Sequence, residues 1–495
     1  MKGQKEKAYP LIALLLLAAG LLVRLVIFFQ NRSLFIDEAN LALNIIEKNA
    51  GAFFQPLDYQ QYAPPLFLLM EKVNTLLFGN GELALRFLPL LASLLQLHLF
   101  YLLVKKFIPQ SCLWWLPLYL MAFSPMLIQY ATEIKQYSTD VLTSVFFLYL
   151  ALRWPYDQLS RWRKVAWGTL GMMAIWWSMP VVFVLFAVGC YYGYQSYLKE
   201  QWKGVLSLLP IISAWLVSFG AYYLTILSID LEKSYLVDYH RPYFLPILPT
   251  SSVEWSRWLN VWSVFVKTTL GGTVLAYVYG VLLLGLGLKS LWQGQRDKFI
   301  LLLFPLLACL AASALEQYSL MPRLALFLTP FLLLIIGIGL SDFWQSIPKK
   351  WLKISLLAPL IIILVNWKGY QYFINPLGWE DSREILSFVA QRAESTDFIY
   401  LSHELKPAYH YYRSYHPRRA EYLLPNPYLA AWDDQASIVL QQRQFPEKSW
   451  LMYTHLIGRK ERNRVAAELQ KLQEQYAIPN QLTPKGAAAY QLIKK

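Results

Sequence analysis

Residues Leu34–Arg86 read LFIDEANLALNIIEKNAGAFFQPLDYQQYAPPLFLLMEKVNTLLFGNGELALR, and the rest of the chain can be interpreted from this stretch. It lies between two long apolar segments, yet it begins with the adjacent carboxylates Asp37 and Glu38 and ends at Arg86. Connections longer than about 12–15 residues are usually either functional or disordered. Because this one is rich in apolar and aromatic residues, it lacks the composition of a disordered segment. We therefore expect an ordered, functional loop between two membrane spans.

The composition of the whole chain indicates a polytopic membrane protein. Of its 495 residues, 56% are hydrophobic and only 15% are charged, and the mean hydropathy is +0.34. Soluble proteins average about 25% charged residues. The apolar run Ala8–Phe29 is long enough to span a bilayer and no small-residue cleavage site follows it. We therefore interpret it as a membrane span and not as a signal peptide.

The net charge of +14 is explained by orientation in the membrane and not by nucleic-acid binding. Lys and Arg residues cluster in short loops at alternate ends of the apolar segments, which is the positive-inside pattern. This pattern predicts a cytoplasmic N-terminus in the plasma (inner) membrane, with the first loop (residues 30–82) and the tail on the other side. We expect eleven transmembrane helices, at about residues 8–29, 83–104, 111–129, 137–154, 165–177, 180–198, 204–228, 270–290, 299–316, 322–344 and 352–367.

The first loop should itself contain two helices. The spacing of its apolar residues predicts an amphipathic helix over residues 38–49, closed by Gly51. The apolar stretch 65–78 is too short to span a bilayer and suits a helix that lies in the membrane interface.

The tail has a different composition and predicts a soluble domain. We expect a transmembrane domain at residues 1–375 and an extracytoplasmic α/β domain at 376–495. Residue patterns in the tail predict two helices, at 381–392 and 461–476, and three strands, at 397–402, 450–454 and 488–493.

Four acidic residues, Asp37, Glu38, Glu133 and Asp140, are predicted to gather at the non-cytoplasmic rim of the spans. An ionisable side chain at membrane depth costs free energy, and such residues usually mark functional sites. These four are therefore candidate catalytic residues. Glu133 and Asp140 are seven residues apart, which would place them on one face of a single helix. The alternatives are that Asp37 is a helix N-cap and that Asp140 interacts with a helix dipole.

Several motifs resemble those of the polytopic glycosyltransferases of the GT-C type, and most closely the protein O-mannosyltransferase and lipid A aminoarabinose transferase group. They are DEANLALNI from Asp37, APPL at Ala63–Leu66, LFGNGELALR ending at Arg86, ATEIKQYSTD at Ala131–Asp140 and SLMPRLALFLTP at Ser319–Pro330. The resemblance covers roughly residues 10–340 and is weak in the tail. One departure is Ala63, since the family often has a basic residue just before the proline segment.

The resemblance implies that a sugar moves from a polyprenyl-phosphate donor to a lipid, glycan or protein acceptor, with inversion at the anomeric carbon. A carboxylate can accept the proton of the acceptor hydroxyl, and Asp37 is the first candidate for this general base. The leaving phosphate gains negative charge, which a cation should stabilise. Arg86, Arg323 and Lys135 are the candidate phosphate-binding residues, with Arg favoured for bidentate contact. The alternative for Arg86 and for Lys135 is a simple interfacial anchor.

Two further points stay open in the sequence. A divalent cation, Mg²⁺ or Mn²⁺, is a possible cofactor, held by Asp37 and Glu133, because oxygen ligands suit these ions. The pair His240-Arg241 in a later outer loop either contacts substrate or lies on the surface.

Two other functions compete with a transferase of this kind. A transporter or flippase of lipid-linked saccharide would place charged sites near the bilayer midplane, often within inverted repeats. Here the middles of the spans are nearly uncharged and the acidic residues lie at one rim, which favours an enzyme that works at a membrane face. A polymerase or ligase that uses diphosphate-linked donors is the rival among transferases.

Overall fold

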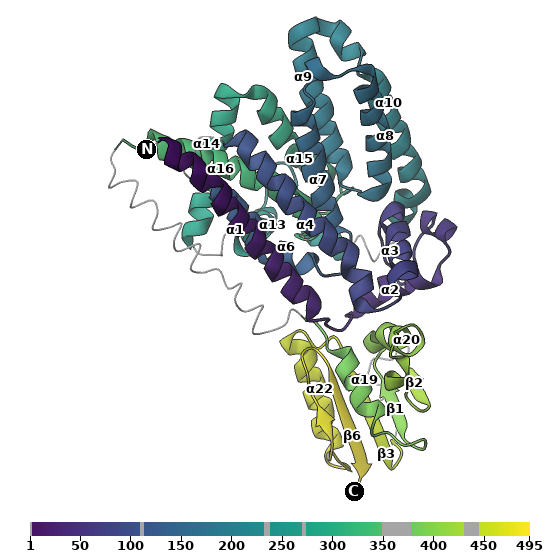
Figure 1. Cartoon of the computed structure of the whole chain (residues 1–495). Coiled ribbons are helices and arrows are strands. Elements are labelled where there is room, and N and C mark those ends of the chain that lie inside the picture. The colour runs from purple at the N-terminus through teal and green to yellow at the C-terminus, as the bar shows by residue number, and fades with distance from the viewer. Residues whose placement is uncertain (1, 109–112, 232–237, 270–273, 349–377, 430–444) are drawn as a thin grey trace.

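The computed structural model describes residues 2–108, 113–231, 238–269, 274–348, 378–429 and 445–495. A bundle of helices forms the larger part of the molecule, and a small domain containing a β-sheet lies at one end of it (Figure 1). The helices of the larger part outside the first loop are α1 (Lys2–Phe29), α4 (Glu82–Phe107), α5 (Trp115–Phe123), α6 (Pro125–Tyr130), α7 (Tyr137–Arg153), α8 (Arg161–Trp177), α9 (Val181–Leu206), α10 (Leu209–Tyr222), α11 (Ser228–Leu231), α13 (Ser252–Thr269), α14 (Val274–Gly294), α15 (Arg296–Ala314) and α16 (Thr329–Ser346).

The predicted spans correspond to helices, although the count of eleven is not confirmed. Each of the first ten predicted spans overlaps a helix or a pair of helices, and the eleventh, at 352–367, lies outside the described residues. The predicted span 111–129 is broken at Ser124, between α5 and α6. Six helical segments of the described chain are long and apolar enough to cross a membrane: Leu11–Phe29, Glu82–Phe107, Val181–Glu200, Trp202–Leu227, Arg296–Ala314 and Leu324–Ser346.

Close backbone contact between α14 and α16 shows how the bundle is packed. A Cβ atom added at Gly339 would lie 2.0 Å from the carbonyl oxygen of Leu283, and one at Gly287 would lie 2.1 Å from that of Ile335. Only glycine lets the two helix backbones approach this closely, which is a common way for membrane helices to associate.

The first loop folds into α2 (Ile36–Glu47), the 3₁₀ turn Ala50–Phe54 and α3 (Pro65–Phe78). The predicted helix at 65–78 is confirmed with the same bounds, and its C-terminal residues Leu76, Leu77 and Phe78 are 75%, 68% and 62% exposed, as expected for a helix that meets lipid. The predicted helix at 38–49 begins two residues earlier, with Phe35 as its N-cap residue. The alternative in which Asp37 is the N-cap is therefore wrong.

The tail contains the predicted helices and strands together with elements that the sequence did not reveal. Its sheet has the strand order β2-β1-β3-β6-β4, with β5 also paired to β6; β1 runs parallel to β2 and β3, and β6 is antiparallel to β3. The elements are α19 (Ser382–Ala390), β1 (Phe398–Leu401), α20 (Lys406–Ser414), β2 (Pro427–Leu429), β3 (Lys448–Tyr453), α22 (Arg459–Leu472), β4 (Tyr476–Ala477), β5 (Gln481–Leu482) and β6 (Ala488–Lys494). The predicted domain boundary near 375 lies outside the described residues.

The C-terminal domain packs directly on the first loop. One apolar core contains Leu41 and Phe67 from the loop helices together with Ile385 and Tyr412 from α19 and α20. All four side chains are fully buried. Because the two regions share a core, they must lie on the same side of the membrane.

A labelling experiment tests this arrangement and the predicted orientation together. In a background with Cys112, Cys190 and Cys309 replaced by Ser, single cysteines at the exposed positions Gln60 and Gln473 should both react with a membrane-impermeant thiol reagent added outside the cell. Opposite labelling of the two sites would contradict the shared core, and protection of both would reverse the orientation predicted from the basic loops.

Candidate active site

A cavity of about 1230 Å³ lies between the membrane helices, the first loop and the C-terminal domain. Five of the seven residues predicted for the site line this cavity: Asp37, Glu133, Lys135, Asp140 and Arg323. They come from three separate parts of the chain, since α2 carries Asp37, the segment around α7 carries Glu133 to Asp140, and the approach to α16 carries Arg323. The fold thus gathers both the acidic and the basic candidates in one place.

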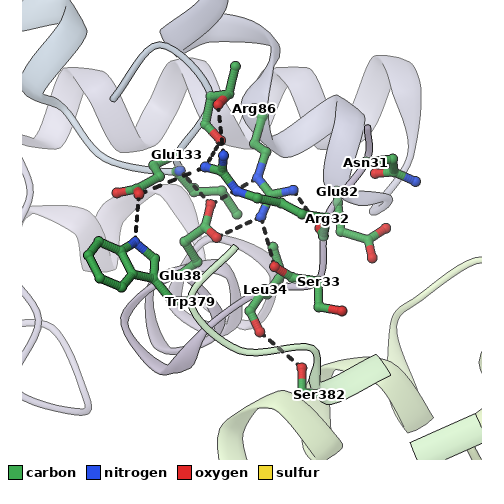
Figure 2. A network of polar contacts seen from close by, with 12 residues as sticks. Asn31, Arg32, Ser33, Leu34, Glu38, Glu82, Arg86, Glu133, Trp379 and Ser382 are labelled. Carbon is green, nitrogen blue, oxygen red and sulfur yellow. Dashed lines mark hydrogen bonds and ion pairs between the residues drawn. The ribbon is translucent and has the colours of Figure 1, made fainter. Parts of the chain in front are cut away.

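The other two predicted residues, Glu38 and Arg86, do not line the cavity and instead form a buried ion pair. The Nη2 of Arg86 lies 2.6 Å from Oε2 of Glu38, and its Nε lies 2.9 Å from Oε1 (Figure 2). The two side chains are 1% and 0% exposed. Arg86 also donates to the backbone oxygens of Arg32 and Ser33, at 2.6 Å and 3.2 Å. With its donors engaged inside the protein, Arg86 is not placed to contact a phosphate, and Glu38 is not placed to contact an acceptor.

This ion pair helps to hold in place the segment that carries Glu133 and Lys135. Glu38 Oε1 accepts a hydrogen bond from the backbone N–H of Ile134 at 3.0 Å, and Ile134 stands between Glu133 and Lys135. Arg32 donates to the backbone oxygen and the hydroxyl of Thr132, at 2.6 Å and 3.1 Å. The segment from Thr132 to Lys135 is therefore held by the first loop.

Glu133 and Lys135 have polar partners at the edge of the cavity. The Glu133 carboxylate lies 3.8 Å from Arg32 and accepts hydrogen bonds from Gln129 and Trp379, at 2.9 Å and 3.1 Å. Burial raises the pKa of Glu133, against the opposing effect of Arg32. Burial lowers the pKa of Lys135, whose Nζ donates to Gln61 at 2.7 Å.

Asp140 lies at the start of α7, as predicted, but it does not share a helix with Glu133. The residues before Tyr137 form turns, so the seven-residue spacing does not correspond to two turns of one helix. The cavity still brings the two carboxylates to the same space. Asp140 Oδ1 accepts a hydrogen bond from the hydroxyl of Ser178 at 2.7 Å.

Arg323 is a cation that lines the cavity, and its contacts there are long. Its Nη1 lies 3.4 Å from Oδ2 of Asp37, and its Nη2 lies 3.4 Å from the Tyr239 hydroxyl. Both contacts are long for charge-assisted hydrogen bonds. The buried Nε has no partner among the residues that the structure describes. Arg323 and Asp37 are 26% and 34% exposed, so a ligand can reach both.

The sequence did not reveal that the C-terminal domain forms one wall of the cavity. The residues that this wall contributes include Trp379, His403, Glu404, Lys406, His410, Arg413 and His455. The tail has no recognisable motif, and residue periodicity alone does not indicate which surface docks on the loop. Of the pair left open, His240 lines the cavity with Nδ1 3.1 Å from the hydroxyl of Ser319, whereas the exposed Arg241 pairs with Asp238.

The side chains around Asp37 and Glu133 do not form an evident metal site. In the described parts of the chain, no group of three or more His, Cys, Asp or Glu residues is arranged to hold a metal ion. The nearest polar partners of the two carboxylates are Arg323 for Asp37, and Arg32, Gln129 and Trp379 for Glu133. A divalent cation at this position stays a prediction.

The chain has a GT-C-like fold, as the sequence motifs predicted. Crystal structures of ArnT from Cupriavidus metallidurans, a lipid A aminoarabinose transferase, have the same fold. The apo form has a TM-score of 0.54 with 14% sequence identity, over 98% of each chain. The form bound to undecaprenyl phosphate has a TM-score of 0.52 with 14% identity, over 97% of each chain.

A weaker similarity extends to the Archaeoglobus fulgidus oligosaccharyltransferase in complex with Zn and sulfate. Its TM-score is 0.49 with 11% identity, over 96% of this chain and 72% of that one. No protein-family model matches the sequence, and no curated protein matches it.

Substitution of Glu38 tests whether the buried ion pair holds the site together. Glu38→Gln leaves Arg86 as an uncompensated buried charge, and breaking a buried pair in this way destabilises a protein by about 3–5 kcal/mol. We expect a clear fall in the thermal unfolding midpoint of the detergent-purified protein, measured by intrinsic fluorescence.

The matched control is Asp58→Asn, which removes an ion pair of the same loop at the surface. Asp58 lies 2.8 Å from Lys48 and is 64% exposed. Surface pairs contribute about 0–1 kcal/mol, so this variant should unfold close to wild type. An equal effect of the two substitutions would mean that the Glu38–Arg86 pair has no special importance.

Proposed function

We propose that this protein is an integral membrane glycosyltransferase, which moves a sugar from a polyprenyl-phosphate donor to a lipid, glycan or protein acceptor on the non-cytoplasmic side of the membrane. The observation that carries the proposal is that one cavity is lined by the carboxylate of Asp37 together with the cations Arg323 and Lys135. Transfer from a phosphate ester needs both kinds of group, a base for the acceptor and positive charge for the leaving group.

The cavity suits a lipid-phosphate donor in its position and its charges. Residues 59–62, which precede α3 in the chain, line it, and the exposed apolar end of α3 is expected at the membrane interface, where the head group of a polyprenyl lipid would lie. The similar ArnT structure that is described as bound to undecaprenyl phosphate supports a donor of this class. In this chain Arg323 and Lys135 are the cavity residues that we assign to the phosphate.

The charge balance of the reaction gives each residue a role. As the bond between the anomeric carbon and the phosphate oxygen breaks, its electron pair stays on the phosphate, and a preorganised cation stabilises the developing charge. Arg323 is suited to this role because it can form two parallel hydrogen bonds to phosphate oxygens. Lys135 adds a second positive charge, and the hydrogen bond from its Nζ to Gln61 orients the lysine side chain.

Asp37 is placed to act on the acceptor. Its carboxylate is one-third exposed to the cavity and lies 3.4 Å from Arg323, so base and leaving-group cation are neighbours. We propose that Asp37 accepts the proton of the acceptor hydroxyl while the hydroxyl oxygen attacks the anomeric carbon. Attack from the face opposite the phosphate inverts that carbon.

The variant Asp37→Asn tests the proposal, because it keeps the shape of the side chain but cannot take up the proton. We expect normal membrane insertion and a fall in turnover of about 10²–10⁴-fold, the usual contribution of general base catalysis. The measurement is sugar release from a panel of synthetic undecaprenyl-phosphate sugars by purified protein. Asp58→Asn, on the exposed surface of the same loop, is the matched control and should turn over like wild type.

Two results would change the assignment. Near-native turnover by Asp37→Asn would transfer the role of base to Glu133 or Asp140, which line the same cavity. Absence of cleavage of every donor by the wild-type protein would contradict the glycosyltransferase itself.

A further inference from the structure

A histidine of the C-terminal domain lies in the cavity with an unusual backbone conformation. His455 follows β3, lines the cavity and has a side chain that is 49% exposed. Its φ angle is 62°, in the left-handed region that residues other than glycine seldom adopt. Such a conformation costs energy and persists only where surrounding contacts hold it, and it is found most often at functional sites.

A buried carboxylate holds this histidine in place. Glu380 is 1% exposed, and its Oε1 lies 2.9 Å from Nδ1 of His455. Since a carboxylate accepts hydrogen bonds, Nδ1 must be the protonated nitrogen. Nε2 then carries the free lone pair, and no partner contacts it among the described residues. A carboxylate that fixes the tautomer and direction of a histidine is the arrangement used where histidine moves protons.

Glu380 also connects His455 to the catalytic loop. Burial raises the pKa of Glu380, against the lowering effects of His455 and of the backbone amide of Ile36, the residue before Asp37. The negative groups that act on His455 are Glu380 first, then Glu404 and Asp37. Together they raise the pKa of His455, against the lowering effect of partial burial. His455 is thus a better proton acceptor than an ordinary histidine.

Asp37 must lose the proton that it takes up before the next turnover can begin. Arg323 lies 3.4 Å from its carboxylate, and Asp37 is in the first turn of α2, at the positive end of the helix dipole.

We propose that His455, oriented by Glu380, receives the proton that Asp37 takes from the acceptor. This inference rests on the glycosyltransferase proposed above and adds a residue of the C-terminal domain to its site. The acceptor oxygen loses its proton to Asp37 and bonds to the anomeric carbon, while the phosphate leaves with the electron pair of the broken bond. The proton then passes from Asp37 to Nε2 of His455, and the half-exposed imidazolium releases it to solvent. Asp37 ends the cycle as a carboxylate and His455 as a neutral imidazole.

Donor cleavage by His455→Asn is the direct test. Asparagine tolerates the left-handed backbone better than most residues, so the loop should keep its conformation. We expect the turnover number for undecaprenyl-phosphate sugar cleavage to fall at least about 10-fold, below the full contribution of a general base. The KM for the donor should stay unchanged, because His455 does not contact the phosphate.

The pH profile separates a proton-transfer role from a structural one. In wild type, turnover should rise with pH through the raised pKa of His455, because only the neutral imidazole can take the proton. His455→Asn should not show this rise of turnover with pH. Glu380→Gln removes the charge that most raises the pKa of His455, so in this variant the rise should occur at lower pH.

Asp58→Asn is the control here as well. Asp58 is 64% exposed on the first loop, pairs with Lys48 at 2.8 Å, and is not among the described residues that line the cavity. Its substitution should leave the pH profile unchanged. In the Asp37→Asn background, adding His455→Asn should produce little further loss, because the two residues act in series.

The outcomes distinguish this inference from the proposed function. If wild type cleaves donor and His455→Asn keeps the wild-type turnover and pH profile, the role of His455 is refuted while the transferase stands. A large additional loss in the double variant would likewise refute transfer in series. If wild type cleaves no donor, both proposals fail together.

Discussion

The buried ion pair between Glu38 and Arg86 is the interaction on which the site depends. It joins the start of α2 to the start of α4, and through Ile134 it also fixes the segment that carries Glu133 and Lys135. Two charges with almost no exposure to solvent are stable only when the remaining hydrogen-bonding atoms are satisfied. The backbone oxygens of Arg32 and Ser33 accept hydrogen bonds from Arg86, so the closed loop and the ion pair stabilise each other.

The C-terminal domain is the second condition for the site. Arg383 of α19 lies 2.9 Å from Glu82 and donates to the backbone oxygen of Asn31 at 2.6 Å, next to the ion pair. His416 lies 2.9 Å from the other oxygen of Glu82. These polar contacts surround the apolar core that the domain shares with α2 and α3, so the wall that carries His455 is held firmly against the loop.

Much of this arrangement could be predicted from the sequence, because apolar length and periodicity are visible there. The bounds of α3 and the strands of the tail follow from such patterns. The roles of Glu38 and Arg86 could not be predicted, since a sequence gives the charge of a residue but not its burial. Glu133 was expected on a helix that in fact begins at Tyr137. His455 was missed because its partner Glu380 is 75 residues away in the chain.

In the proposed function, the donor phosphate binds at Arg323 and Lys135. The most direct measurement is a cryo-EM structure of the protein in a lipid nanodisc with undecaprenyl phosphate. We predict phosphate density within hydrogen-bond distance of Arg323 and Lys135. Phosphate density instead at the cavity of about 450 Å³ lined by Lys199 and Arg296 would contradict the account, because no predicted catalytic residue lies there.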